Sequence, residues 1–346
     1  MNSQNLTSEL KAEEKKATHT EQELIERYSN PVVANQLLAA LEKRIESNPT
    51  NVLLLSQKAM ILRRIAKLEQ ALLVYKQILA LEPHNEYAHR SAAVLSGSPL
   101  PVSKEKGSFP APFVAIPNFL PDSKLSALYQ ATLENEKYFK PSGVGATEPH
   151  YDPDKRQSFV WGGIGEWRPF MKGLLRERLP QLCESLCIDT FEPGSVEVKI
   201  TNYLNGGFFI THADNSISKG KTGRAISYLL YYHSQPKAFQ GGDLFLFDSD
   251  LSNERYTNAN FTRIRCQNNT LVAFNSPYFH AVQPVRLESE RFDQGRMALG
   301  GHINYMDTED STKKTLRQSR QSRCLDRSTV KSATFEKIQK NYNKRA

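Results

Sequence analysis

Two histidines and one aspartate have the residue types and the spacing of a metal site. His212 and Asp214 are separated by one residue, and His280 follows 66 residues after Asp214. On an extended strand, residues i and i+2 project to the same side, so His212 and Asp214 can reach one ion together. The fold must then bring His280 to them on a neighbouring strand. Two histidines and a carboxylate form the facial triad that holds Fe(II) and leaves coordination positions open for substrate and oxygen.

The residues around this motif predict a series of short strands. Glycine, asparagine and proline pairs mark turns, as in Gly206-Gly207, Gly241-Gly242 and Ser276-Pro277. Alternating or β-branched runs predict strands at 196–203, 208–212, 224–232, 243–247, 270–274 and 280–285, and another that starts near 295. Many short strands with this punctuation are typical of a jelly roll or a barrel.

Four motifs in sequence order resemble those of a known family. They are Tyr203-X-X-Gly206-X-X-Phe209-X-X-His212-X-Asp214, then Gln240-Gly241-Gly242-Asp243-Leu244-Phe245, then Phe274-X-X-X-X-X-His280-X-Val282-X-Pro284-Val285, and finally Arg296, 16 residues after His280. With them, residues 109–305 resemble the double-stranded β-helix of 2-oxoglutarate/Fe(II)-dependent oxygenases, in the prolyl-4-hydroxylase-like branch. The resemblance implies an α+β fold in which this jelly roll has flanking helices.

The resemblance also implies a set of cofactors and the residues that hold them. It implies Fe(II) at the His-Asp-His triad, 2-oxoglutarate and O2 as co-substrates, and leaves room for ascorbate as a reductant. By position, Arg296 would hold the far carboxylate of 2-oxoglutarate, and Tyr231 and Tyr203 would complete that site. A planar guanidinium suits a carboxylate because two parallel charge-assisted hydrogen bonds fix its orientation. Phe209 stands where the family often has tyrosine, so one hydroxyl is missing from the expected wall.

Three further histidines are weaker candidates. His233 ends a predicted strand in a polar turn, which favours a surface or structural role. His302 follows Gly300-Gly301 and could approach the site, although a structural role in the strand is favoured. His150 lies in a Pro- and Asp-rich loop, where a solvated position is the commoner outcome.

Residues 1–96 have a helical pattern of a different kind. Asn48-Pro49 and Glu82-Pro83 are 34 residues apart, the period of a tetratricopeptide repeat. The frame puts Leu37, Leu41, Leu55, Ala59, Leu62, Ala71, Tyr75 and Pro83 at packing positions. It predicts helices at 31–47, 52–66, 68–82 and 84–96, with one more near 20–28. Because fewer than three repeats rarely stand alone, this module should pack on the barrel or on a second copy, as a homodimer would allow.

The remaining segments are a linker at 97–108 and a basic tail at 306–346. The chain has 346 residues and a net charge of +8, and the tail holds eleven Lys and Arg against five Asp and Glu. A solvated tail is the default, and an electrostatic docking arm is the alternative. A nucleic-acid partner is disfavoured because the charge surplus lies in this tail. Polar first residues, no apolar run of membrane length and four cysteines favour the cytoplasm.

The predicted function is hydroxylation of an amino-acid residue, prolyl or other, of a peptide or protein. The order of a helical module before the oxygenase segment resembles collagen-type prolyl hydroxylases. A free amino acid or a natural-product intermediate is the alternative substrate, and a catalytically idle scaffold is the alternative of another class. A halogenase is disfavoured because Asp214 supplies a carboxylate, and a nucleic-acid demethylase because no second arginine follows Arg296 at the required spacing.

Overall fold

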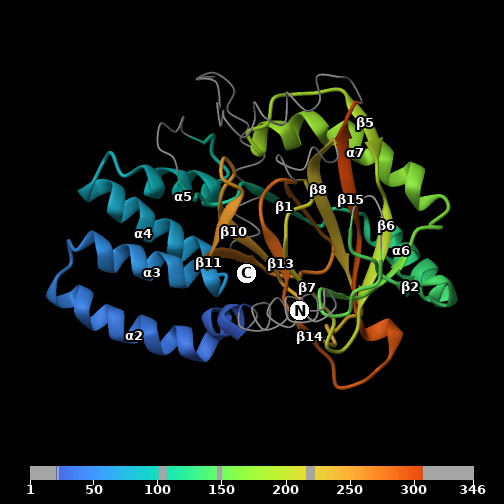
Figure 1. The fold of residues 1–346 in the computed structure, drawn as a ribbon, viewed down its shortest axis with the longest axis horizontal. Coiled ribbons are helices and arrows are strands. Elements are labelled where there is room, and N and C mark those ends of the chain that lie inside the picture. Colours follow the sequence, from blue (N-terminus) through green and yellow to red (C-terminus); the bar gives the residue numbers. More distant parts are fainter. Residues whose placement is uncertain (1–20, 22, 101–106, 146–149, 216–222, 307–346) are drawn as a thin grey trace, which may run out of the picture.

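The computed structural model describes residues 21, 23–100, 107–145, 150–215 and 223–306. Two antiparallel sheets lie at the centre of the molecule (Figure 1). Helices α2 to α5 lie beside the smaller sheet, and α6 and α7 lie on the other side, next to the larger one (Figure 1). No helix within these ranges is long and apolar enough to cross a membrane.

The larger sheet has eight strands, in the order β1-β12-β8-β15-β6-β4-β2, with β5 paired to β15. Its strands are β1 (Phe113–Pro117), β2 (Lys140–Pro141), β4 (Phe159–Trp161), β5 (Pro193–Val196), β6 (Lys199–Tyr203), β8 (Arg224–Tyr232), β12 (Thr270–Asn275) and β15 (Arg296–Tyr305). The β8 strand is apolar on both faces, which is the pattern expected of a strand buried in the middle of a sheet.

The smaller sheet has five strands, in the order β11-β10-β13-β7-β3. They are β3 (Arg156–Gln157), β7 (Phe208–His212), β10 (Leu244–Asp250), β11 (Arg255–Ile264) and β13 (His280–Val282). A short pair, β9 (Gln240–Gly241) and β14 (Val285–Arg286), closes one end. The predicted strands are confirmed, apart from breaks at 197–198 and 283–284 that separate β5 from β6 and β13 from β14. The strands β1 to β4, β9 and β11 were not predicted.

Period-two alternation decides which residues of the larger sheet face the helices. Ile226, Leu230 and Tyr232 of β8 pack in one apolar cluster with α7 (Trp167–Ser185) and α6 (Asp122–Glu134), whereas Tyr231 belongs to the cluster on the other face. Burying one face under helices leaves the opposite face turned toward the smaller sheet. The functional residues discussed below lie on that inner face.

The N-terminal helices agree closely with the predicted ranges. They are α2 (Pro31–Ser47), α3 (Val52–Arg64), α4 (Leu68–Leu81) and α5 (Glu86–Ser96), and residues 23–29 are also helical. Asparagine side chains cap α2, α3 and α5 by accepting hydrogen bonds from backbone N–H groups of the first turn. Two packing positions were wrong. Pro83 is exposed, and Leu37 is 48% exposed because the buried stripe of α2 is Ala34, Leu38 and Leu41.

A buried ion pair joins the helices to the smaller sheet. The Arg63 guanidinium at the end of α3 donates two hydrogen bonds to the Asp248 carboxylate of β10, at 2.5 and 3.2 Å. Thr262 of β11 and Tyr87 of α5 complete the network. The Arg63 and Asp248 side chains are 1% and 0% exposed, so neither charge has access to water. Apolar side chains of both regions also belong to one continuous core. The N-terminal helices therefore pack on the smaller sheet within one chain.

Some predicted segments lie outside the described residues. These are the first 20 residues, half of the linker at 97–108 and the basic tail apart from Met306. The boundaries proposed for them stay predictions.

Removing the Arg63 guanidinium should destabilise the fold strongly. In Arg63→Met, the Asp248 carboxylate would be left buried without a counterion, which costs on the order of 3–5 kcal/mol. The matched control is Lys58→Met on the same helix, which breaks an ion pair with the 54%-exposed Glu42. That change should cost about 1 kcal/mol or less. Urea unfolding measures the free energy of unfolding of both variants. Equal decreases would show that the buried ion pair stabilises the fold no more than the exposed one does.

Candidate active site

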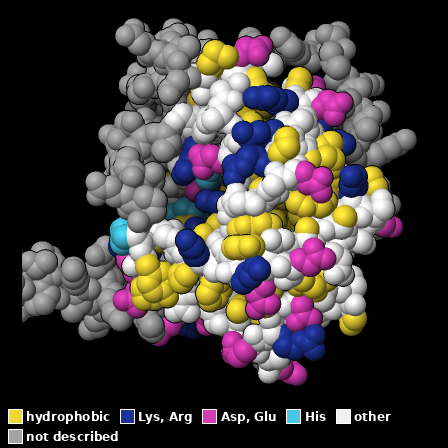
Figure 2. Space-filling model, turned by 90° about the vertical axis from the view of Figure 1, so that its right-hand side faces the viewer, with side chains coloured by type: hydrophobic (Ala, Val, Ile, Leu, Met, Phe, Trp, Pro, Cys, Tyr) yellow, Lys and Arg dark blue, Asp and Glu magenta, His cyan; other side chains and the backbone are white. Residues whose placement is uncertain are grey.

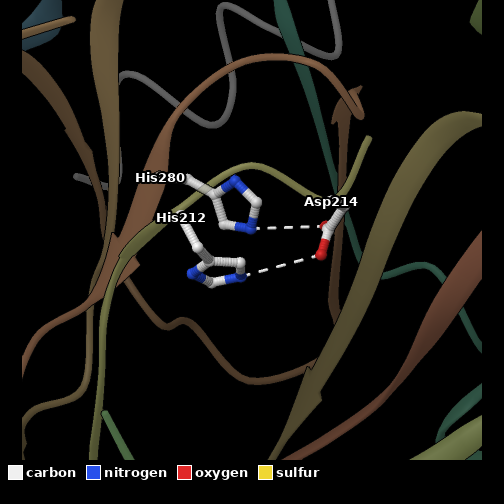
Figure 3. Close-up of side chains that lie close together, drawn as sticks. All are labelled: His212, Asp214 and His280. Atoms are coloured by element: carbon white, nitrogen blue, oxygen red, sulfur yellow. Dashed lines mark ion pairs between the residues drawn. The ribbon is translucent and has the colours of Figure 1, made fainter. Parts of the chain in front are cut away.

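The three predicted metal ligands meet in one place. His212 ends β7, Asp214 follows it, and His280 begins β13, which pairs with β7 so that the two histidines lie opposite each other. Figure 3 shows both imidazole rings directed at the carboxylate. The Nε2 atoms of His212 and His280 lie 3.6 and 3.3 Å from the two Asp214 oxygens. Ligand atoms that are each about 2.1 Å from one ion, at right angles, are about 3 Å apart, so this arrangement fits a single ion.

Backbone carbonyls set the proton position on both histidines. Nδ1 of His212 lies 2.8 Å from the Ile210 carbonyl oxygen, and Nδ1 of His280 lies 3.0 Å from that of Tyr278. A carbonyl only accepts, so each Nδ1 carries the hydrogen and each Nε2 keeps a free lone pair. Both lone pairs face Asp214, in the tautomer that a metal ion requires.

The surroundings also favour the ionisation states that bind metal. Burial, and then His280, lower the pKa of His212 to about 4, so this ring is neutral near pH 7. Burial alone would raise the pKa of Asp214, but the neighbouring His302 and His280 side chains hold it well below its usual range. Neutral imidazoles and a charged carboxylate are the donor set of a facial triad.

Ser227 orients the aspartate. Its hydroxyl donates a 2.7 Å hydrogen bond to Oδ2 of Asp214 and also lies 2.9 Å from the Ser276 hydroxyl. His302 is close as well, with Nδ1 3.2 Å from the Ser227 hydroxyl and 3.8 Å from Asp214. His302 therefore does approach the site. The motifs did not predict Ser227, although the period of two places it on the strand face of Tyr231.

The three predicted co-substrate residues cluster on the larger sheet. Arg296 of β15 pairs with Tyr203 of β6, and its guanidinium carbon lies 4.9 Å from the Tyr203 ring centre and 4.8 Å from that of Tyr231. Tyr203 lines the cavity that contains the triad, whereas Arg296 and Tyr231 lie just behind its ring. Nη2 of Arg296 and the Tyr231 hydroxyl are buried without a hydrogen-bond partner in the described structure. Unpaired buried donors of this kind fit the far carboxylate of 2-oxoglutarate.

The Gly241-Gly242 turn makes room for Arg296. Gly242 has a φ of 70°, and its carbonyl accepts a 2.6 Å hydrogen bond from Nε of Arg296. A Cβ on Gly242 would lie 3.0 Å from Cδ of Arg296, and one on Gly241 would lie 2.2 Å from the Pro284 carbonyl oxygen. Glycine is therefore required at both positions.

Phe209, which stands where the family often has tyrosine, contributes an aromatic ring without a hydroxyl to the cavity lining. Its ring stacks on His212 with centres 3.6 Å apart, and the Arg156 guanidinium carbon lies 4.7 Å from the same ring centre. Arg156 and Lys199 also line the cavity, and the motifs predicted neither. The period of two could have shown Lys199, which shares a strand face with Tyr203.

The other histidines lie away from this cavity. His233 is buried, at 6% exposure, so it does not lie at the surface. His150 is exposed. Arg286 and Arg291, the nearest alternatives to Arg296 in sequence, have side chains that are 68% and 67% exposed.

Comparison with known proteins agrees with this geometry. Residues 198–304 match the family model of the 2OG-Fe(II) oxygenase superfamily. An uncharacterized PKHD-type hydroxylase of Synechocystis sp. is 31% identical over 215 residues, which cover 60% of this chain and 68% of that protein. The chain belongs to the 2OG-Fe(II) oxygenase superfamily. It is an Fe(II)- and 2-oxoglutarate-dependent dioxygenase with O2 as a co-substrate.

Two solved structures are more distant. A Pseudomonas putida prolyl-4-hydroxylase is 20% identical, with a TM-score of 0.40, covering 56% of this chain and 93% of that one. A Trichoplax adhaerens prolyl hydroxylase, solved with a peptide fragment of hypoxia inducible factor, is also 20% identical. Its TM-score is 0.42, and the match covers 58% of this chain and 86% of that one. Similarities at this level support no conclusion about substrate.

Substitutions at the triad should separate direct from indirect contacts with a metal. Ser227→Ala removes the hydrogen bond to Asp214, together with the contacts to Ser276 and His302, but no metal donor. It should weaken Mn(II) affinity about 10–100-fold, as expected for residues that orient a ligand. Asp214→Ala removes a metal ligand and should therefore weaken Mn(II) affinity more than Ser227→Ala does. Calorimetric titration of metal into each variant gives the affinities, with replacement of the exposed His89 of α5 by alanine, His89→Ala, as the control. Unchanged affinity in Asp214→Ala would place the metal elsewhere.

Proposed function

We propose that this dioxygenase hydroxylates an amino-acid residue, prolyl or other, of a peptide or protein. In this proposal the His212, Asp214 and His280 triad holds Fe(II), and Arg296 holds the far carboxylate of 2-oxoglutarate. One observation supports it: the triad and Tyr203 of the larger sheet line one cavity, and the Arg296 guanidinium lies against the Tyr203 ring. A five-carbon keto diacid can bridge the two sets, with its keto acid end at the metal.

When bound, Fe(II) with 2-oxoglutarate and O2 supplies the oxidising power to replace an unactivated C–H by C–OH, with succinate and CO2 as co-products. The residues of the protein position the metal and the co-substrate. Nε2 of both histidines and the Asp214 carboxylate, oriented by Ser227, present three donors on one face. Buried Arg296 fixes the other end of the co-substrate, and apolar neighbours such as Phe209, Leu244 and Phe274 exclude water from the cavity.

Finer assignments of the architecture are part of the same proposal. We assign residues 109–305 to a double-stranded β-helix, supported by the two facing antiparallel sheets. We assign residues 1–96 to a tetratricopeptide-like module, supported by helices at the predicted ranges. The buried Arg63–Asp248 pair suggests that this module stabilises the catalytic sheet as well as offering a surface for a partner.

The peptide or protein substrate rests on two weaker supports. The relative in Synechocystis is named a PKHD-type hydroxylase, and helical repeats usually form protein-contact surfaces. A free amino acid is the alternative within the same chemistry.

Removing the Arg296 side chain should chiefly weaken co-substrate binding. In Arg296→Ala the far carboxylate of 2-oxoglutarate would lose a buried bidentate partner, at a cost on the order of 2–5 kcal/mol, or roughly thirty-fold or more in affinity. Titration of 2-oxoglutarate into the metal-loaded variant measures this loss. Arg286→Ala and Arg291→Ala remove exposed guanidinium groups of the same segment and should leave the affinity unchanged. A loss in either control equal to that in Arg296→Ala would move the role away from Arg296.

The proposed reaction itself is tested by intact mass. Candidate peptides and free amino acids are incubated with the full chain, iron, oxygen and 2-oxoglutarate, and one of them should gain the mass of one oxygen atom. The gain should depend on 2-oxoglutarate and should be absent with Asp214→Ala. Succinate formation from 2-oxoglutarate alone, with no gain on any peptide or amino acid, would leave a dioxygenase of another substrate class.

A further inference from the structure

Two cationic side chains line the cavity beside the triad, and the co-substrate site does not use them. Lys199 comes from β6 of the larger sheet, and Arg156 comes from β3 of the smaller one. They therefore approach the cavity from its two different walls. On the face drawn in Figure 2, Lys and Arg side chains gather beside a recess in which histidine is visible.

Lys199 has no anionic partner of its own. Its ammonium group is neither hydrogen-bonded nor ion-paired to any residue that the structure describes. Burial lowers the pKa of Lys199 and the nearby Arg156 guanidinium lowers it further, whereas the more weakly acting carboxylates of Glu197 and Asp214 do not offset this shift. The two cations thus repel each other across a partly dry space, a cost that a bound anion would remove.

The carboxylates near this pair are already engaged. Glu197 accepts two hydrogen bonds from the Arg224 guanidinium, at 3.0 and 3.1 Å. Asp214 belongs to the triad and accepts from Ser227. Arg156 donates to Ser158 at 2.9 Å and rests on the Phe209 ring, which holds its guanidinium in place without neutralising it. A positive charge is therefore left over at the cavity wall.

The strand register separates Lys199 from the far end of the co-substrate site. On β6, Tyr203 pairs with Arg296, whereas Lys199 pairs with Gly300. Four residues along a strand correspond to about 13 Å. Lys199 and Arg296 thus stand at different levels of the cavity, and Gly300 and Gly301, which have no side chains, lie next to Lys199.

We propose that Lys199 and Arg156 bind a carboxylate of the substrate and so place the target C–H beside the metal. The inference rests on the proposed function, because it puts the substrate in this cavity. The carboxylate is either the side chain of an acidic residue in a peptide or the α-carboxylate of an amino acid. A rigid guanidinium and a flexible ammonium on facing walls can hold it from two sides.

Three small probes test this assignment. N-acetyl-L-isoglutamine carries only a side-chain carboxylate, its isomer N-acetyl-L-glutamine carries only an α-carboxylate, and N-acetyl-L-glutaminamide is neutral. Binding is followed by proton relaxation of each probe near Mn(II) in the full chain, with 2-oxoglutarate saturating. At least one carboxylate isomer should bind roughly tenfold or more tighter than the neutral amide, since hydrogen bonds to charged groups are the stronger ones. The tighter isomer identifies the source of the carboxylate.

Variants of Lys199 decide whether the preference belongs to this site. Lys199→Met should abolish it and Lys199→Arg should retain it, while Lys76→Met on exposed α4 should change nothing. Lys199→Met leaves no carboxylate without its partner, so it should fold normally, which a thermal melt checks. Equal binding of all three probes, or a preference that survives Lys199→Met, would overturn the proposal.

A direct role in co-substrate binding is the rival explanation for Lys199. Titration of 2-oxoglutarate into Mn(II)-loaded Lys199→Met should give the affinity of the unmodified chain. A tenfold loss would show that Lys199 holds the near carboxylate of 2-oxoglutarate and would overturn the proposal. If the unmodified chain bound neither Mn(II) nor 2-oxoglutarate, the proposed function would fail and this inference with it. If it bound both without preferring a carboxylate probe, only this inference would fail.

Discussion

The antiparallel pairing of β7 with β13 is the constraint on which the site depends. It places His212 directly opposite His280, and the chain then turns so that Asp214 faces both rings. Neither strand carries enough residues to be stable by itself, with five in β7 and three in β13. The metal geometry is therefore maintained by the rest of the smaller sheet and by what covers it.

That support can be followed outward strand by strand. His280 pairs with Leu246 of β10, and β10 pairs with β11 along most of its length. The far end of β10 carries Asp248, which the Arg63 guanidinium of α3 neutralises. The N-terminal helices thus stabilise the strands that position a metal ligand. The larger sheet, covered by α6 and α7 on its outer face, positions Arg296. Its inner-face residues Tyr203 and Tyr231 belong to the same apolar cluster as Leu246 and Val282 of the smaller sheet, so one core holds both ends of the site together.

Much of the site could be predicted because its signals are local. The His-X-Asp spacing follows from the period of two along a strand, the place of Tyr231 follows from the family pattern, and the helices follow from a 34-residue repeat. The features that could not be predicted depend on contacts between segments far apart in the sequence. Nothing near Arg63 in the sequence indicates Asp248, 185 residues away, and the approach of Arg156 to Lys199 requires both sheets to be in place. Leu37 was misplaced because repeat alignment alone cannot resolve a shift of one residue on a helix.

The central claim is that metal and 2-oxoglutarate share one site between the sheets, and their thermodynamic coupling tests it most directly. 2-Oxoglutarate is titrated by calorimetry into the metal-free chain and into the same chain loaded with Mn(II). Because one molecule would contact both the ion and Arg296, we expect the metal to tighten 2-oxoglutarate binding, and 2-oxoglutarate to tighten metal binding by the same factor, roughly 5–150-fold. Equal 2-oxoglutarate affinity with and without metal would contradict the shared site.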